Sequence, residues 1–154
     1  MIIIADTREQ CPYTFTCIDP PPQVEVATLR TGDYSLRGYE DAFCVERKTL
    51  QDAYGTFGQG RQRFQRELER MVSLQFAAVI IESQWDEIVK RPPSRSRLNP
   101  KTVVASIAAW SQRFPNVHVW TVPGREFGER WTYRLLERFH KDREREKRNH
   151  RPKC

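Results

Sequence analysis

The apolar and polar positions of the chain follow two periods, one typical of strands and one typical of helices. Strand-forming runs over residues 2–5, 24–28, 34–36, 43–48 and 117–122 predict β-strands. The continuous apolar run at 76–81 predicts a central strand that is buried on both faces. Apolar side chains recur at helical spacing within residues 61–74, 100–110 and 127–139, so we expect three amphipathic helices there.

The order of these elements indicates the fold class. Strands come first and then alternate with helices, as in an α/β protein with a mixed sheet. With 154 residues the chain has room for one domain of common size. We expect that domain to span residues 1–140. Residues 141–154 have mixed charge and no apolar anchors, so we expect a basic tail that is a frayed helix end or disordered.

Charge is distributed unevenly along the chain. The net charge is +6, yet the residues from Lys141 onward are seven basic and three acidic, and the segment Lys90 to Lys101 holds five basic residues and no acidic one. The rest of the chain is therefore slightly acidic. An acidic body with two basic segments suits a protein that holds a cation beside a polyanion, and solvated surface segments would give the same charges.

The cysteines and the N-terminus exclude several classes of protein. Four cysteines occur without a Cys-x-x-Cys pair, so neither a disulfide framework nor a zinc site is indicated and free thiols are expected. The apolar start "MIII" is too short for a signal peptide or a membrane span. We expect a soluble protein with no membrane partner.

Three consecutive charges, Glu46, Arg47 and Lys48, end a strand-forming stretch and need an explanation. Burying a charge costs several kcal/mol unless a partner, a metal or a substrate compensates. Side chains alternate along a strand, so Glu46 and Lys48 share one face and Arg47 lies on the other. Either this strand is a solvated edge with cross-strand ion pairs, or it ends at a functional site.

A hairpin after the Gly32-Asp33 turn would bring Asp33 close to Glu46. Two carboxylates form a hard-oxygen site that suits Mg²⁺ together with waters and a phosphate. Lys48 on the same face is then placed to orient or deprotonate an attacking water. This set is suited to phosphodiester hydrolysis. The structural alternatives are that Arg47 pairs with Asp52 and that Asp6 caps a turn.

Several segments, taken in order, resemble the nuclease domain of the XPF family of structure-specific DNA endonucleases, whose signature is GD…ERKxxxD. They are "IIIADTRE", "LRTGDYSL", "CVERKTLQD", "GTFGQGRQRF" and "AAVIIES". The resemblance covers roughly residues 2–140 and is less specific in its last part. It implies a restriction-endonuclease-like fold, in which a central mixed β-sheet is flanked by α-helices.

The resemblance also implies roles for individual residues. Asp33 and Glu46 would bind Mg²⁺ or Mn²⁺, with Asp6 or Glu9 as a further carboxylate, and Lys48 would activate water. Arg47 would bind phosphate or hold Asp52 and the geometry of the site. Arg61 would be a phosphate clamp at the start of a helix, unless it is an ordinary exposed arginine. The residues expected to bind DNA are Arg61, Arg63, Arg95, Arg97 and Lys101.

The expected function is a metal-dependent DNA endonuclease acting near branched or flap structures. Members of the family usually carry a tandem helix-hairpin-helix domain, for which this chain has no room, so substrate choice would lie in the nuclease domain, its basic segments or another polypeptide. One alternative is a catalytically silent DNA-binding scaffold or partner subunit of another nuclease. Another is a nuclease of the wider PD-(D/E)xK type that acts on linear ends or on RNA.

The C-terminal half carries many large aromatic residues. Trp110, Trp120, Phe127, Trp131 and Phe139 exceed what one sheet face needs, and aromatic residues are enriched in interface cores. Nuclease domains of the resembled family also pair through this region, so we expect a homodimer, unless these rings complete the core of the monomer. The protein would act in the cytoplasm or on the nucleoid of a prokaryote or virus, or in the nucleus of a eukaryote.

Overall fold

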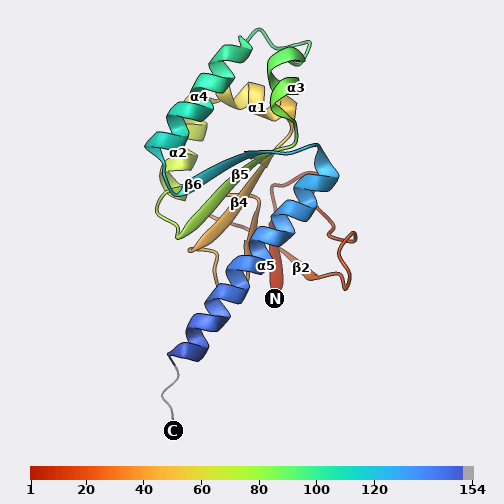
Figure 1. The fold of residues 1–154 in the computed structure, drawn as a ribbon, viewed down its shortest axis with the longest axis vertical. Coiled ribbons are helices and arrows are strands. Elements are labelled where there is room, and N and C mark those ends of the chain that lie inside the picture. The colour runs from red at the N-terminus through yellow and green to blue at the C-terminus, as the bar shows by residue number, and fades with distance from the viewer. Residues whose placement is uncertain (151–154) are drawn as a thin grey trace.

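The computed structural model of the chain, which describes residues 1–150, is built on one six-stranded mixed sheet (Figure 1). The strands are β1 (Ile2–Asp6), β2 (Gln23–Ala27), β3 (Tyr34–Leu36), β4 (Phe43–Lys48), β5 (Phe76–Ile81) and β6 (Val117–Thr121), in the order β2-β1-β3-β4-β5-β6. β3 runs antiparallel to both β1 and β4, whereas the pairs β1·β2, β4·β5 and β5·β6 are parallel. The predicted mixed sheet is confirmed.

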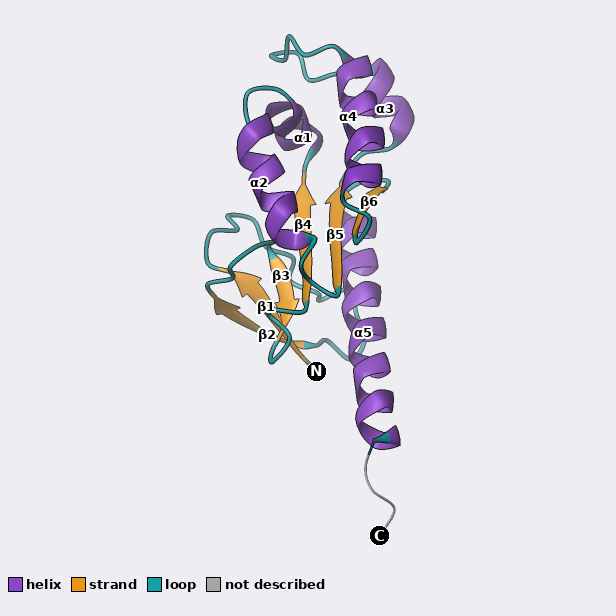
Figure 2. Cartoon of the chain, turned by 90° about the vertical axis from the view of Figure 1, so that its left-hand side faces the viewer, coloured by secondary structure: helices purple, strands orange, loops and turns teal. Residues whose placement is uncertain are grey.

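Helices cover both faces of this sheet. The helices are α1 (Leu50–Phe57), α2 (Arg61–Met71), α3 (Trp85–Lys90), α4 (Pro100–Arg113) and α5 (Arg125–Asn149). One apolar cluster joins α1 to α4 with β4, β5 and β6, and a second joins α5 and the N-terminal segment with the opposite face. Figure 2 shows α1 to α4 gathered together while α5 runs separately along the sheet. The expected α/β layering is therefore present.

Side-chain alternation along β4 and β5 divides the core between these two faces. In β5, Ala77, Val79 and Ile81 belong to the first cluster and Ala78 and Ile80 to the second. This strand is buried on both faces, as the apolar run predicted. β4 lies between β3 and β5, so the charged strand is not an exposed edge. Its charges are carried into the interior of the sheet.

Two short helices were not foreseen from the sequence. α1 contains Gly55, which lowers helix propensity, and α3 is only six residues long. The signal for α1 was a capping box, in which Thr49 Oγ1 accepts a hydrogen bond from the backbone N–H of Asp52 and the Asp52 carboxylate accepts one from the backbone N–H of Thr49. Tertiary packing stabilises both helices, because Tyr54 and Ile88 are buried in the first cluster.

The last helix is longer than the sequence predicted. A frayed or disordered tail was expected from Lys141, but α5 continues to Asn149. Ion pairs at helical spacing support this extension, for example Arg138–Asp142 at 2.9 Å and Lys147–Glu144 at 3.0 Å. Arg143 also stacks on Phe139, with its Cζ 5.1 Å from the ring centroid. The rest of the expected tail, residues 151–154, lies outside the described residues.

Candidate active site

The candidate site lies where β4 ends and α2 packs over the sheet. Glu46 and Lys48 share the face covered by α2, and Lys48 Nζ lies 2.8 Å from Glu46 Oε1. Lys48 Nζ also lies 4.4 Å from the centroid of the Phe64 ring on α2. Both charged residues are buried, at 8% and 7% exposure for Glu46 and Lys48. A buried, hydrogen-bonded ion pair of this kind needs a function to explain its cost.

Asp33 is held beside this pair by three backbone hydrogen bonds. Its N–H donates to Val45 O, its carbonyl oxygen accepts from Asp6 N–H, and its carboxylate accepts from Arg47 N–H at 2.7 Å. Gly32 makes the turn possible because its φ is +77° and an added Cβ would lie 2.9 Å from Cys44 Cβ. The expected hairpin therefore brings the Gly-Asp turn to β4.

The surroundings of the Asp33 and Glu46 carboxyls raise the pKa of both. Burial raises the pKa of Asp33 to about 7, and neighbouring negative charges at Glu9 and Glu67 add to that rise. Burial also raises the pKa of Glu46 well above its usual range, against the opposing effect of Lys48 and with the further contribution of Asp33. A half-buried acid and a buried acid whose pKa values are both raised form a site where a cation would be favoured.

Lys48 is an ammonium in this arrangement. Burial lowers the pKa of Lys48, but the charge of Glu46 and the hydrogen bond to its carboxylate outweigh burial, so the net shift is upward. The lysine therefore holds its proton while it is paired. A cation bound at Glu46 would repel the positive charge of Lys48 and so favour its neutral amine.

The donor set fits Mg²⁺ or Mn²⁺ better than a metal that needs several protein ligands. Within residues 1–150, no group of three or more His, Cys, Asp or Glu side chains is placed to hold a metal ion. Asp33 and Glu46 offer two oxygen-bearing groups, and Mg²⁺ commonly uses one or two carboxylates, several waters and substrate phosphates. The observation in favour of a cation is that both carboxyls have raised pKa values, with the charge of Asp33 contributing to the rise at Glu46.

Asp6 and Glu9 lie beside the site with other partners. The Asp6 carboxylate already accepts four hydrogen bonds, three from Arg8 and one from Leu29 N–H. Burial raises its pKa, but these donors outweigh burial and the pKa is lowered. Glu9 Oε1 accepts from Cys11 N–H at 2.8 Å and lies 3.5 Å from Arg47 Nη1. Asp6 thus ties β1 to the segment after β2, and metal binding by either residue stays a prediction.

Arg47 lies on the opposite face from Glu46 and Lys48, as the strand alternation predicted. Its guanidinium group forms two 2.8 Å hydrogen bonds with the Glu82 carboxylate at the end of β5. Tyr13 Oη donates to the same Glu82 carboxylate at 2.7 Å. The alternative pairing of Arg47 with Asp52 is wrong, because the Asp52 carboxylate caps α1 through Thr49. A catalytic role for Asp52 stays a prediction.

Two residues near the site were missed at the sequence level. Glu67, on the helix that covers the site, adds its negative charge to the environment of Asp33, Glu46 and Lys48. Glu67 follows Phe64 by three positions, so the helical period predicts that both residues lie on the face of α2 that covers the site. Tyr13 binds Glu82, and no local sequence signal indicates that contact across the fold.

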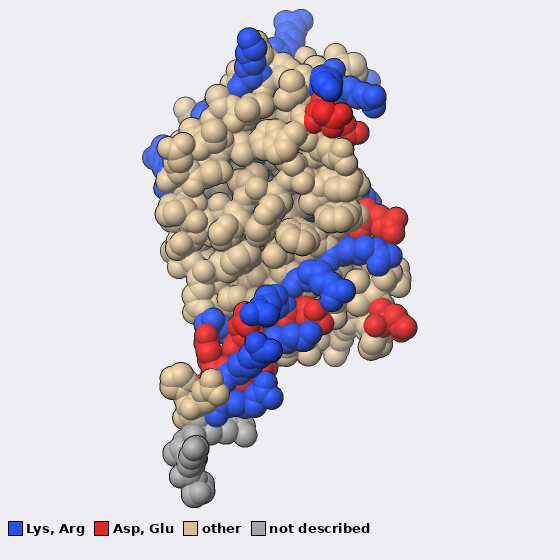
Figure 3. Space-filling model, in the orientation of Figure 1, with Lys and Arg blue, Asp and Glu red and all other residues tan. Residues whose placement is uncertain are grey.

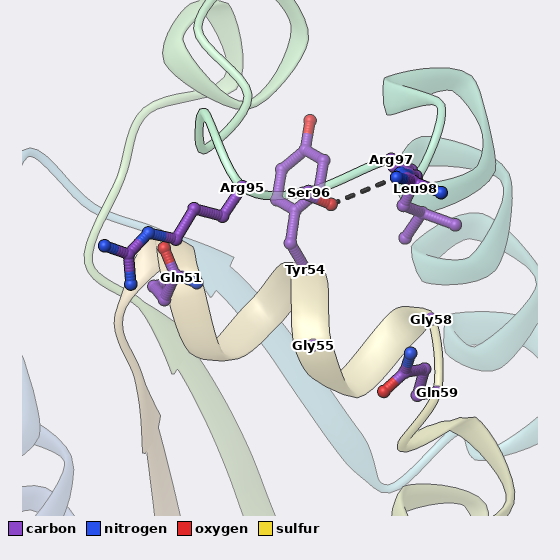
Figure 4. A pocket seen from close by; sticks show the side chains of 9 residues that line it. All are labelled: Gln51, Tyr54, Gly55, Gly58, Gln59, Arg95, Ser96, Arg97 and Leu98. Carbon is purple, nitrogen blue, oxygen red and sulfur yellow. Dashed lines mark hydrogen bonds between the residues drawn. The ribbon is translucent and has the colours of Figure 1, made fainter.

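Four of the five residues expected to bind DNA line two surface hollows, and Arg63 is not among the residues that line them. Arg95 and Arg97 line a hollow of about 840 Å³ between α1 and the loop before α4 (Figure 4). Arg61 and Lys101 line a second hollow of about 510 Å³ between α2 and α4. The Gly58–Arg61 turn separates the two hollows. Arg61 also stacks on Trp110, with its Cζ 4.7 Å from the ring centroid, and donates to Ser106 Oγ.

These basic residues differ from those of α5 in their partners. Among residues 1–150, none of Arg61, Arg63, Arg95, Arg97 and Lys101 forms an ion pair with a carboxylate, whereas most basic residues of α5 do. Cations without a protein partner are free to bind phosphate. The hollows are thus better candidates for a polyanion contact than the end of α5.

The aromatic residues of the C-terminal half separate into two groups. Trp110 is buried with Phe57 and Phe64, and Phe139 packs on Phe43. Trp120, Trp131 and Phe127 instead form a partly exposed row beside the edge strand β6, and Phe127 is 46% exposed. Figure 3 shows that the surface over β6 carries few charges, while the lower part of α5 is densely charged.

Comparisons with known proteins agree with this fold. The family model described as the ERCC4 domain matches residues 5–135. Among solved structures, XPF from Aeropyrum pernix is similar over 88% of this chain and 61% of its own, with a TM-score of 0.65 and 21% sequence identity. A search of curated proteins found no match. None of the helices in residues 1–150 has the length and apolar character of a membrane span.

Proposed function

Because the chain belongs to the ERCC4 domain family, we propose that it is a metal-dependent DNA endonuclease that hydrolyses phosphodiester bonds. The observation that carries this proposal is the cluster at the end of β4, in which the half-buried Asp33 lies beside the buried pair of Glu46 and Lys48. A structural ion pair alone would not explain a second carboxyl placed against it, because that carboxyl raises the cost of burial. A cation and a phosphate would offset that cost.

Each residue of the cluster has a separate role in the proposal. Asp33 and Glu46 hold the cation, with Mg²⁺ or Mn²⁺ as the ions that match their oxygen donors. A bound ion of this kind would supply Lewis-acid stabilisation of the phosphoryl oxygen and a lower pKa for water. Lys48 orients or deprotonates the attacking water. Arg47 keeps the ends of β4 and β5 together through Glu82 and so positions the cluster.

The two basic hollows support DNA as the polyanion. Their unpaired cations come from α2, α4 and the loop before α4, so they form a surface of several elements rather than one charged segment. We propose that this surface binds DNA near a branch or flap. The chain spans 61% of the length of XPF from Aeropyrum pernix, so the branched preference is an inference that a substrate panel must test.

A cleavage panel tests the proposal directly. Labelled single-stranded, blunt duplex, flap and RNA substrates would be incubated with Mg²⁺, with Mn²⁺ and with EDTA. The proposal predicts metal-dependent cleavage of DNA, strongest on the flap, and no cleavage in EDTA. DNA binding without cleavage by the intact cluster would favour the second function, a catalytically silent scaffold or partner subunit. Preferential cleavage of RNA would assign the domain to a different substrate class.

We also propose that the protein forms a homodimer through β6 and the start of α5. The row of Trp120, Phe127 and Trp131 supports this surface, because it is apolar, partly exposed and next to an edge strand. Trp110 and Phe139 do not belong to this surface, since both pack within the protomer. The site of action would be the compartment that holds the DNA, the cytoplasm or nucleoid of a prokaryote or the nucleus of a eukaryote.

A further inference from the structure

The larger hollow has a glycine in its wall that the fold itself does not require. Gly55 lies inside α1, where glycine destabilises a helix by about 0.5–1 kcal/mol relative to alanine. A Cβ added at Gly55 would meet nothing within 4 Å, and its φ is not in the left-handed region. Neither backbone conformation nor close packing explains the residue. Its effect is to keep the wall of the hollow open.

The side chains around Gly55 are polar and regularly spaced. Gln51, Gly55 and Gln59 follow one another at intervals of four residues, and all three are exposed. All three line the hollow, Gln51 and Gly55 from α1 and Gln59 from the turn that follows it (Figure 4). Figure 4 shows Arg95 above Gln51, and Arg97 over the other end of α1 near Gly58. Tyr54, buried and bonded to Ile88 O, lies between them.

The chemistry of this lining selects an anion that also carries hydrogen-bonding edges. The residues around the hollow include two arginines and no carboxylate. Among residues 1–150, the guanidinium groups of Arg95 and Arg97 form no ion pair, so they remain free for phosphate. The Gln51 and Gln59 amides each offer a donor and an acceptor, as the edges of nucleobases require. A purely apolar ligand would leave all of these groups unsatisfied.

From this lining we infer that the hollow between α1 and residues 95–98 binds one unpaired nucleotide of the DNA strand, with its phosphate on Arg95 or Arg97 and its base edge on Gln51 or Gln59. The inference rests on the proposed function and specifies a part of its substrate. An unpaired nucleotide can present its Watson–Crick edge to these amides together with its phosphate, whereas in a duplex that edge is used in base pairing. The volume of about 840 Å³ lies within the usual range of about 300–1,000 Å³ for small-ligand sites.

The position of α1 links this subsite to the candidate active site. The helix starts two residues after Lys48, so Gln51 is in the first turn that follows the catalytic strand. A strand held along α1 would thus leave the active site through the hollow. Such a subsite would favour substrates with a single-stranded segment next to the cleaved bond, which is the chemistry of a flap or a branch.

The test fills the hollow at Gly55 and measures binding without cleavage. Fluorescence anisotropy in EDTA would compare a labelled oligo(dT) with a blunt duplex of the same length. Gly55→Leu is expected to weaken oligo(dT) binding about tenfold, the size of one lost charge-assisted hydrogen bond, and to leave duplex binding unchanged. Gly55→Ala is expected to raise the melting temperature and keep oligo(dT) affinity, which shows that the residue itself is dispensable for folding.

Controls separate this inference from the proposed function. Gln112→Leu places the same apolar side chain at an exposed position of α4 and is expected to bind both probes as the wild type does. Unchanged oligo(dT) binding by a folded Gly55→Leu variant would overturn the subsite, as would equal loss for both probes. Saturation by thymidine monophosphate with no binding of oligo(dT) would also overturn it, because the occupant would then be a free nucleotide. The cleavage panel would judge the nuclease proposal independently of these results.

Discussion

The guanidinium group of Arg47 and the carboxylate of Glu82 form two parallel hydrogen bonds, Nε–Oε1 and Nη2–Oε2, each 2.8 Å long. This pair joins the ends of β4 and β5 on the face opposite Lys48. Tyr13 binds the same carboxylate, and an added Cβ at Gly128 would lie 2.5 Å from Tyr13 Oη, so α5 packs closely over the pair. Arg47 therefore acts on the site through the backbone of β4.

Arg47→Lys should separate this positioning role from phosphate binding. Lysine keeps the charge but loses the two-pronged contact, so the free energy of unfolding should fall by about 2 kcal/mol, less than full rupture of a buried pair. Cleavage should fall as the end of β4 becomes less ordered. The salt dependence of DNA binding should stay unchanged. Arg47→Gln removes the charge as well, and a salt slope flatter by about 0.9 in that variant would show instead that Arg47 contacts a phosphate.

Lys48→Ala and Glu46→Gln should each abolish cleavage while the fold remains intact. Glu46 can stay neutral once Lys48 is removed, because burial already raises the pKa of its carboxyl. Circular dichroism should therefore show a folded protein, and DNA affinity measured in EDTA should be close to that of the wild type. Lys141→Ala removes an exposed lysine of α5 and should cut normally. Cleavage at the wild-type rate by either site variant would show that the site is assigned wrongly.

The raised pKa of Asp33 predicts a pH dependence of stability in the metal-free protein. Its pKa is about 7 in the folded state against an ordinary value of 3.8, so the folded state retains the proton longer than the unfolded state. The resulting stabilisation is complete below the unfolded pKa and is lost as pH rises through about 7. In EDTA, the melting temperature of the wild type should decline over this window relative to Asp33→Asn. Added Mg²⁺ should restore stability most strongly at the high-pH end of this window.

The control for this titration is Asp41→Asn, which removes an exposed carboxylate. Its melting temperature should follow the pH dependence of the wild type. If Asp33→Asn also followed the wild type across the whole window, the Asp33 carboxyl would not be the titrating group, and its burial beside Glu46 would have no consequence for stability.

Arg97→Ala and Arg138→Ala should differ in their effect on DNA binding. Arg97 has no carboxylate partner in the described chain and faces a hollow, whereas Arg138 lies 2.9 Å from Asp142. Loss of one phosphate contact should flatten the plot of log K against log salt by about 0.7 on single-stranded DNA such as oligo(dT). We expect that change for Arg97→Ala and little change for Arg138→Ala. A larger change for Arg138→Ala than for Arg97→Ala would show instead that α5 provides the DNA-binding surface.

Phe127→Glu should dissociate the homodimer without unfolding the protomer. Phe127 is 46% exposed and stacks on Trp131, so a charge there is tolerated by the monomer but is costly inside an apolar interface. Light scattering at tens of micromolar should report a dimer for the wild type and a monomer of 18.2 kDa for the variant. A wild-type protein that is already monomeric at that concentration would exclude the proposed dimer.

Much of the fold was predictable because it depends on local periodicity. The apolar run at 76–81 identified a strand buried on both faces, and the i, i+4 stripe after Gly124 identified the last helix. The strand period also placed Glu46 with Lys48 and separated them from Arg47, and the Gly32-Asp33 turn identified the hairpin. The family resemblance and the mixed sheet are both confirmed.

Other features depended on long-range packing that no local pattern encodes. Partners such as Glu82 for Arg47 and Tyr13 for Glu82 are separated by 35 and 69 residues, so only the assembled sheet brings them together. The extension of α5 to Asn149 has no apolar stripe to indicate it. Ion pairs at helical spacing support this part of the helix instead.

The sequence by itself determined the α/β class, the charged end of β4 and the residue types suited to a metal-dependent phosphodiesterase. Periodicity and turn chemistry act over a few residues, so a sequence displays them directly. Only the tertiary structure decided that Asp33 adds its charge to the buried surroundings of Glu46, that Asp6 already has four donors, and that the basic loop forms a hollow with α1. Burial and electrostatic coupling depend on distances across the fold, and those distances are fixed only when the sheet and its helices pack together.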